Sequence, residues 1–192
     1  GLALQLTDAA DLLENRLEEL EDALVRQAVT HKHTLMIGRS HGVHAEPITF
    51  GLKLLLWVDE VRRHRNRLQD ARSGIAVGKI SGSVGTHANV PPHVEEWTCE
   101  ALGLAVAPVS NQILQRDRHA HFVSTLAIIA CSLDKFSTEL RSLQRTEIRE
   151  AEEPFEAGRH GSSSMPHKRN PSRLERTSGL ARVLRSHAQV AL

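Results

Sequence analysis

The segment from Gly161 to Pro171 has the composition of an anion-binding loop. It reads GSSSMPHKRNP, with three consecutive serines, a histidine, two cations and an amide. Hydroxyls and backbone N–H groups can donate hydrogen bonds to an anion, and the two prolines stiffen the chain around Lys168 and Arg169. A flexible Gly-Ser linker is the alternative. The prolines favour a loop that closes over an anion, and two cations are too few for a nucleic-acid patch.

A second candidate segment, Gly38–Pro47, places His41 between small residues that would let it approach a ligand closely. A histidine there suits a general acid or base near neutral pH. The alternative is a loop histidine that caps a helix or lies on the surface. Close histidine pairs occur at His31 and His33, at His41 and His44, and at His119 and His121. Twelve histidines make such pairs common by chance, and no H-E-x-x-H context or nearby cysteine accompanies them, so we expect no metal.

The third segment, Asn111–His119, precedes a long periodic stretch. We expect Asp117 to be the N-cap of a helix and Gln112 to be able to bind a carboxylate, although a solvated capping loop would have the same composition. P-loop, Rossmann and G-x-S-x-G patterns are absent from the sequence.

Composition excludes several classes of protein. The chain has 192 residues, 40% of them apolar, which is enough for one packed domain. Its net charge of +1 gives no general attraction to nucleic acid or membrane, and no apolar run approaches the ~20 residues of a membrane span. No secretory leader opens the sequence, and Cys99 and Cys131 lack C-x-x-C spacing. We therefore expect a cytoplasmic protein with both thiols reduced and in the core.

The elements that must position these segments are helices. Leucines in alternating steps of three and four define an amphipathic helix at the start of the chain, and a similar stripe from Phe122 to Leu143 predicts a helix ~50 Å long. The predicted helices cover residues 1–29, 48–72, 93–103, 117–149 and 172–192. Loops fill residues 30–47, with a short extended piece at 34–37, and residues 73–92 and 154–171. We predict an all-α fold, an elongated bundle of long antiparallel helices, of a kind that often forms oligomers.

The residues of the loop carry a family resemblance. Gly161–Pro171 matches the signature G-S-S-x-M-P-x-K-x-N-P of the fumarase/aspartase superfamily at every fixed position. Within the superfamily, the sequence resembles the adenylosuccinate lyases and the 3-carboxymuconate cycloisomerases at His167 and Arg169. It resembles the lyases in particular at Gly38–Pro47 and Gln115–Ala120. The resemblance runs through all 192 residues but covers a little under half of a typical member. Because residues 1 and 192 also fall inside predicted helices, we expect residues 1–192 to be the central helical-bundle domain, incomplete at both ends.

The resemblance implies a β-elimination without metal or organic cofactor. Adenylosuccinate would give AMP and fumarate, and the succinylated carboxamide ribotide of purine synthesis (SAICAR) would also release fumarate. Ser162 would be the base that removes the succinyl Cβ proton, assisted by Ser163. His41 would protonate the departing nitrogen, and Glu175 would pair with His41. The residues expected to bind substrate are Ser40, Gln112, Lys168, Asn170 and Arg176.

Members of this family are homotetramers whose active sites each combine three subunits, so His41 and Ser162 of one chain would serve different sites. This chain alone would then be catalytically incomplete. Ser40 stands where the family commonly has threonine, which preserves the hydroxyl. Two alternatives stay open: a 3-carboxymuconate cycloisomerase-type enzyme on the same scaffold, and a structural bundle without catalysis.

Overall fold

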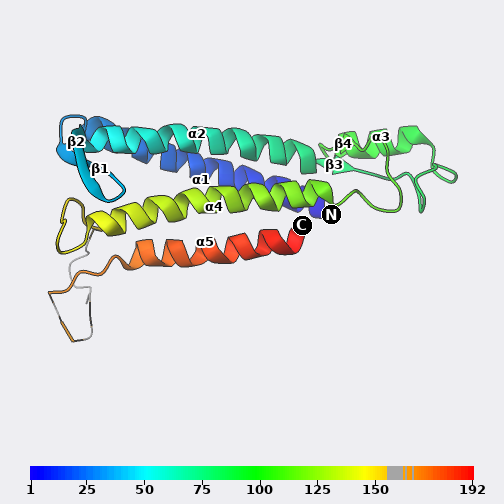
Figure 1. Ribbon diagram of the computed structural model, residues 1–192. Coiled ribbons are helices and arrows are strands. Elements are labelled where there is room, and N and C mark those ends of the chain that lie inside the picture. The colour runs from blue at the N-terminus through cyan, green and yellow to red at the C-terminus, as the bar shows by residue number, and fades with distance from the viewer. Residues whose placement is uncertain (155–161, 163, 166) are drawn as a thin grey trace.

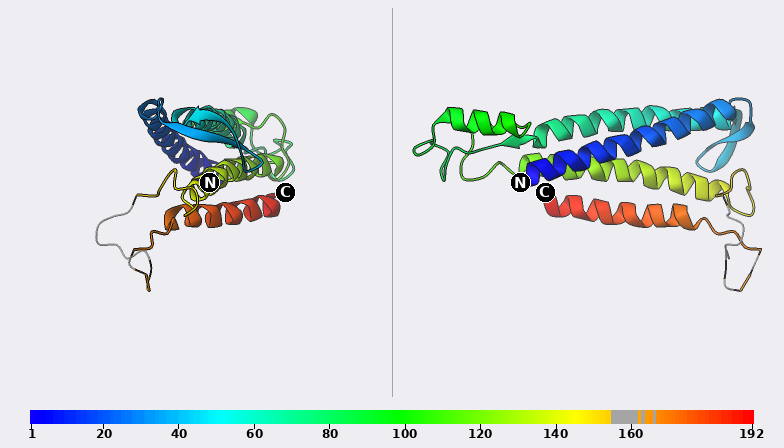
Figure 2. Two further views of the ribbon diagram at one scale, coloured as in Figure 1. Left: turned by 60° about the vertical axis from the view of Figure 1, so that its left-hand side comes forward. Right: turned by 180° about the vertical axis from the view of Figure 1, so that it is seen from behind.

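The computed structural model describes residues 1–154, 162, 164, 165 and 167–192. In this part of the chain, long helices run side by side in an elongated bundle (Figures 1 and 2). The helices are α1 (Leu2–Thr30), α2 (Phe50–Ile75), α3 (Pro92–Ala101), α4 (Asp117–Leu143) and α5 (Ser172–Ala191). The strands are β1 (Leu35–Ser40), β2 (Val43–Thr49), β3 (Val77–Gly78) and β4 (Ala105–Val106). The prediction of a mostly helical, elongated bundle is confirmed.

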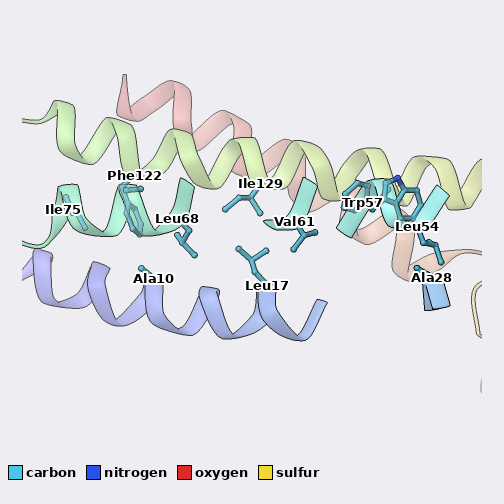
Figure 3. Packing of buried hydrophobic residues seen from close by; sticks show 12 residues of the cluster. Ala10, Leu17, Ala28, Leu54, Trp57, Val61, Leu68, Ile75, Phe122 and Ile129 are labelled. Carbon is cyan, nitrogen blue, oxygen red and sulfur yellow. The ribbon is translucent and has the colours of Figure 1, made fainter. Parts of the chain in front are cut away.

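The bundle is held by an apolar seam between α1, α2 and α4. Leu17, Val61 and Ile129, one from each helix, belong to the same buried cluster (Figure 3). Near one end of the seam the Trp57 ring stacks on Phe136, with centroids 4.6 Å apart and planes 20° from parallel. The three-and-four spacing of the leucines produces this seam, because it brings one apolar face of each helix to the shared axis.

Helix α5 packs against α4 in a different way. Its buried residues are small, namely Ser178, Ala181 and Ala188, and none belongs to the main core cluster. Small side chains let the two helix backbones approach closely. Larger apolar residues on α5, including Leu180, Val183 and Val190, are exposed.

A charged seam runs beside the apolar one between α1 and α2. Arg65 donates to Glu14 at 2.7 Å, to Glu21 at 2.8 Å and to Glu18 at 3.2 Å. The three carboxylates lie three and four residues apart, which is the spacing of one helix face. Arg62 also binds Glu21, and these hydrogen bonds, with that from Arg65, hold the pKa of the Glu21 carboxyl below its ordinary value.

A buried polar chain links α2 to α4. His64 Nε2 lies 2.8 Å from Ser132 Oγ, and Ser132 donates to Glu60, which also binds Lys135. Burial lowers the pKa of His64, and the nearby Arg67 charge lowers it further. The neutral imidazole is therefore the stable form inside the bundle.

The prediction that residues 30–47 form a loop was wrong. Strands β1 and β2 make an antiparallel hairpin that includes residues 35–37 of the expected extended piece and continues to Thr49. Ile48, expected at the start of a helix, pairs with Met36 instead, and α2 begins at Phe50. Strand β2 is exposed along residues 43–47, on both of its faces, so the hairpin buries too few apolar side chains to show the alternation that marks a larger sheet.

Three further details differ from the sequence-based expectations. Helix α4 ends at Leu143, about 40 Å long at ~1.5 Å per residue, because the chain reverses through a turn in which Glu150 N–H donates to the Leu143 carbonyl. Arg116, not Asp117, is the N-cap of α4. Cys99 is buried as expected, but Cys131 is exposed on α4, and both thiols are free.

Residues 76–116 form a small cap at the end of the bundle opposite the hairpin (Figure 1). Strands β3 and β4 pair in parallel, and Lys79 Nζ donates to the carbonyls of Gly82, Asn111 and Gln112. The lysine thus ties the two irregular stretches of the cap together. No helix among the described residues is long and apolar enough to cross a bilayer.

Candidate active site

Ser40 and His41 lie at the tip of the β1–β2 hairpin. Ser40 pairs with Val43, so His41 and Gly42 are the two central residues of the turn, with φ of 55° and 77°. Positive φ at both positions is the requirement of the tight turns that match strand twist. Glycine adopts it freely and histidine does so more readily than most residues. The turn therefore presents the exposed His41 side chain beyond the end of the strands.

The base of the hairpin is fixed to α1 and α2. Thr49 caps α2 by accepting a hydrogen bond from Leu52 N–H at 3.1 Å. Gly51 N–H donates to the His31 carbonyl at 2.9 Å, and a Cβ at Gly51 would collide with the Ala28 carbonyl and the Lys32 backbone. A glycine is required here because the two helices approach at backbone distance.

The turn after α4, residues 144–153, holds both ends of the 154–171 segment. Gln144 accepts from Glu153 N–H at 3.1 Å and donates to the Arg169 carbonyl at 3.2 Å. The Glu153 carboxylate accepts from the N–H groups of Arg173 and Leu174 and so caps α5, while Glu152 pairs with Arg169. A carboxylate at a helix N-terminus is favoured by the helix dipole.

Part of the predicted anion-binding loop belongs to the described residues. Ser162 Oγ accepts from Ser164 N–H at 3.4 Å and from Met165 N–H at 3.3 Å, which orients its hydroxyl within the loop. The Lys168 side chain is exposed, and the Asn170 carbonyl accepts from Ser172 N–H at 2.8 Å where α5 begins. Ser163 lies outside the described residues.

Glu175 lies in the first turn of α5 and Arg176 follows it; both are exposed. Glu175 lines a cavity of about 330 Å³ together with Arg141, Arg145 and Arg169. An adjoining cavity of about 800 Å³ is lined by Lys168, His167 and residues of the 144–153 turn. The expected Glu175–His41 pair is not formed within this chain, since the hydrogen bonds and ion pairs of the described residues do not join these two side chains. It stays a prediction for residues of different subunits.

Gln112 lies in the cap, at the other end of the bundle. It lines a cavity of about 670 Å³ with Lys79, Arg116 and His119. Helix α2 has 26 residues and therefore separates this cavity from the hairpin by about 39 Å. In one chain, Gln112 cannot touch a small molecule held by His41 or Lys168.

The structure adds polar residues that sequence reasoning missed. Arg39 and Glu150, 111 positions apart, form a two-bond ion pair between the hairpin and the 144–153 turn. Gln144 and Glu153 hold the stem of the loop. Side-chain spacing carries no signal for such long-range contacts. Among the described residues, no three His, Cys, Asp or Glu side chains are grouped so that they could hold a metal ion.

Comparison with known families identifies the class of protein to which this helical bundle belongs. The sequence model of a family described as "Lyase" matches residues 1–185. The chain therefore belongs to this lyase family. It is 54% identical to adenylosuccinate lyase of Bacillus subtilis (strain 168) over 191 residues and 54% identical to that of Synechocystis over 192 residues. All of this chain is covered in both cases, and it spans 44% of the length of each relative.

Solved structures agree with this assignment. The 3-carboxy-cis,cis-muconate lactonizing enzyme from Pseudomonas putida superposes with a TM-score of 0.88 at 38% identity, covering 98% of this chain and 43% of that enzyme. A fumarate lyase from Mesorhizobium sp. BNC1 superposes with a TM-score of 0.84 at 31% identity, covering 98% and 41%. The long-helix bundle is thus shared by relatives named for different activities.

Proposed function

We propose that residues 1–192 are the central helical domain of an adenylosuccinate lyase, which releases fumarate from adenylosuccinate and from SAICAR. The observation that carries the proposal is the 54% identity to adenylosuccinate lyases along the whole chain. Identity to the muconate lactonizing enzyme is lower, at 38%, and for this reason we favour the purine substrate over the muconate one.

In this proposal the chemistry is divided between the hairpin tip, the 161–171 segment and the start of α5. Ser162 removes the Cβ proton and Ser163 assists it, while Lys168 and Asn170 stabilise the carboxylate onto which the charge of the carbanion spreads. His41, paired with Glu175, protonates the leaving nitrogen. Fixed cations and donors in a site that excludes water are the physical help that a weakly acidic serine hydroxyl needs.

The separation of about 39 Å between Gln112 and the hairpin supports a shared site. If Gln112, with Ser40 and Arg176, binds the same substrate, the residues must come from different copies of the chain. We therefore propose a homotetramer, which the exposed apolar residues of α5 also favour, because an exposed apolar helix face is typical of an interface. A cytoplasmic location is part of the same proposal.

The test is fumarate release from adenylosuccinate by the full-length protein. We expect turnover by the wild type and a loss of about 10²- to 10⁴-fold for Ser162→Ala and for His41→Gln, as for removal of a general base or acid. Ser73→Ala, at an exposed serine on α2 that lines none of the cavities described above, is the matched control and should retain full activity. Mixing the two inactive variants should restore part of the activity if the sites are shared.

Two results would contradict the proposal. Turnover of 3-carboxymuconate with no fumarate from adenylosuccinate would identify the alternative enzyme of the same scaffold. Absence of both reactions in a folded full-length protein would favour a structural bundle without catalysis.

A further inference from the structure

We propose that Arg39 and Glu150 are positioning residues, whose ion pair fixes the His41-bearing tip of the hairpin relative to the helical bundle. This inference rests on the proposed function, in which His41 acts on substrate. Arg39 lies two residues before His41 on β1, and Glu150 lies in the turn after α4. No sequence-based expectation assigned a role to either residue.

The geometry of the pair restrains direction as well as distance. Arg39 Nη1 donates to Glu150 Oε2 at 2.7 Å, and Nη2 donates to Oε1 at 2.8 Å. Two parallel bonds between planar groups fix the orientation of both, which a single lysine bond would not do. About a fifth of each side chain is exposed, so water competes weakly for the pair.

Among the described residues, the hairpin has no comparable link nearer its tip. Its base is anchored where Phe50 N–H donates to the Thr34 carbonyl and where Gly51 meets α1. Beyond the base, residues 38–46 bond mainly to each other across the two strands. Within the described residues, the Arg39–Glu150 pair is the one hydrogen-bonded connection between residues 38–46 and the helices. Without it, the two-stranded tip would be free to swing about its base, because an isolated hairpin is marginally stable.

Glu150 is itself held in place. Its N–H donates to the Leu143 carbonyl at 3.0 Å, which fastens the turn to the end of α4. Its hydrogen bonds from Arg39 lower the pKa of the Glu150 carboxyl, and the same bonds raise that of the Arg39 guanidinium, so the pair stays ionised near neutral pH. Behind it, Lys53 on α2 pairs with Glu139 on α4, and both charges act on the first pair.

The same turn also carries the stem contacts of the 154–171 segment, through Gln144, Glu152 and Glu153. The 144–153 turn therefore fixes the position of the hairpin relative to the base of the predicted loop. A displacement of about 1 Å at a reacting group can cost about 100-fold in rate. We therefore expect Glu150 to affect turnover although it touches no substrate.

The experiment compares variants in the full-length protein. Glu150→Gln removes the negative charge and one of the two hydrogen bonds at nearly constant side-chain volume. Arg39→Lys keeps the positive charge but cannot donate two parallel hydrogen bonds to the carboxylate. Asp11→Asn is the matched control, because Asp11 and Arg72 also form a two-bond pair, at 2.5 and 2.9 Å, toward the cap end of the bundle. The double exchange Arg39→Glu with Glu150→Arg tests rescue.

Three measurements are taken: kcat and KM for fumarate release, the pH profile of kcat, and hydrogen–deuterium exchange of residues 35–49. We expect Glu150→Gln and Arg39→Lys to lower kcat by about 10- to 100-fold with KM changed by less than about threefold. The alkaline limb of the pH profile, which a general acid such as His41 sets, should move. Hairpin exchange should rise, and the double exchange should recover about tenfold of the lost kcat. Asp11→Asn should leave kcat and hairpin exchange at wild-type levels.

Retention of at least half of the wild-type kcat by Glu150→Gln, with an unchanged pH profile, would overturn the proposal. So would an equal loss in Asp11→Asn, which would indicate a general effect on folding. If the wild type releases no fumarate, the proposed function fails separately. In that case hydrogen–deuterium exchange of residues 35–49 tests the anchoring role by itself. Faster exchange in Glu150→Gln but not in Asp11→Asn supports this role, and unchanged exchange in Glu150→Gln refutes it.

Discussion

Arg65 is the centre of the charged seam between α1 and α2, and its replacement by methionine isolates the contribution of that seam to stability. Methionine retains most of the apolar stem that packs between the helices but removes the guanidinium. Glu14 and Glu21, with side chains only 19% and 11% exposed, would then lose a charged donor each. Glu21 would keep its bond from Arg62.

The magnitude follows from burial. Hydrogen bonds to charged groups contribute about 1.5–3 kcal/mol each to the free energy of unfolding when they are buried. Because Arg65 is 27% exposed, we expect each of its bonds to contribute about 1.5 kcal/mol or less. The bond to Glu18, which is 56% exposed, adds little. We expect Arg65→Met to lower the free energy of unfolding by about 2–3 kcal/mol at neutral pH.

Urea unfolding followed by circular dichroism at fixed protein concentration measures this difference. Arg63→Met is the matched control on the same helix, because Arg63 pairs with Asp59 at the surface, and it should cost less than about 0.5 kcal/mol. The pKa of Glu21 is held below its ordinary value of 4.5, first by Arg62 and then by Arg65. The stabilisation that ionised Glu21 provides is therefore complete above pH 4.5 and is lost as pH falls through the folded-state pKa of Glu21. In acid, the difference in free energy of unfolding between the wild type and Arg65→Met should therefore become smaller. Equal losses in the two variants, or a gap that persists in acid, would refute the reasoning.

Other substitutions test the packing and the buried histidine. The pKa of His64 is lowered by burial, so the folded state binds fewer protons than the unfolded one, and stability should decline as pH falls below about 6.5. His64→Gln should flatten this decline in urea titrations at several pH values, whereas the exposed His33→Gln should not. Phe122→Ala removes a ring that is 2% exposed and should cost about 3–5 kcal/mol in the same assay, and a loss under 1 kcal/mol would show that the seam is loosely packed. Gly51→Ala should destabilise by about 1–3 kcal/mol because its Cβ meets backbone, while Gly179→Ala, with open space on α5, should stabilise by about 0.5–1 kcal/mol. Thermal midpoints that move in the same direction for both glycine variants would contradict this account.

The tip of the hairpin shows where local sequence reasoning stopped short. His41 and Gly42 carry a usable signal, since a histidine–glycine pair can supply the two positive φ angles of a two-residue turn. That signal is weaker than an Asn-Gly pair, and the glycines and histidines around it favoured a loop. Helix α4 was predicted to continue to residue 149, six residues beyond the end of its apolar stripe at Leu143. The chain instead reverses at Gln144 through contacts that side-chain spacing does not encode.

The long helices, their apolar faces and the candidate chemistry of the 161–171 segment could be predicted from the amino-acid order, because each depends on residues that are close together in the chain. The packing of the helices, which residue spacing does not encode, set which groups lie at each end of the bundle. It put Gln112 about 39 Å from the hairpin, and it joined Arg39 to Glu150 across 111 positions. Such pairings arise only after the helices have packed, since the apolar seam sets the register in which distant charged side chains meet.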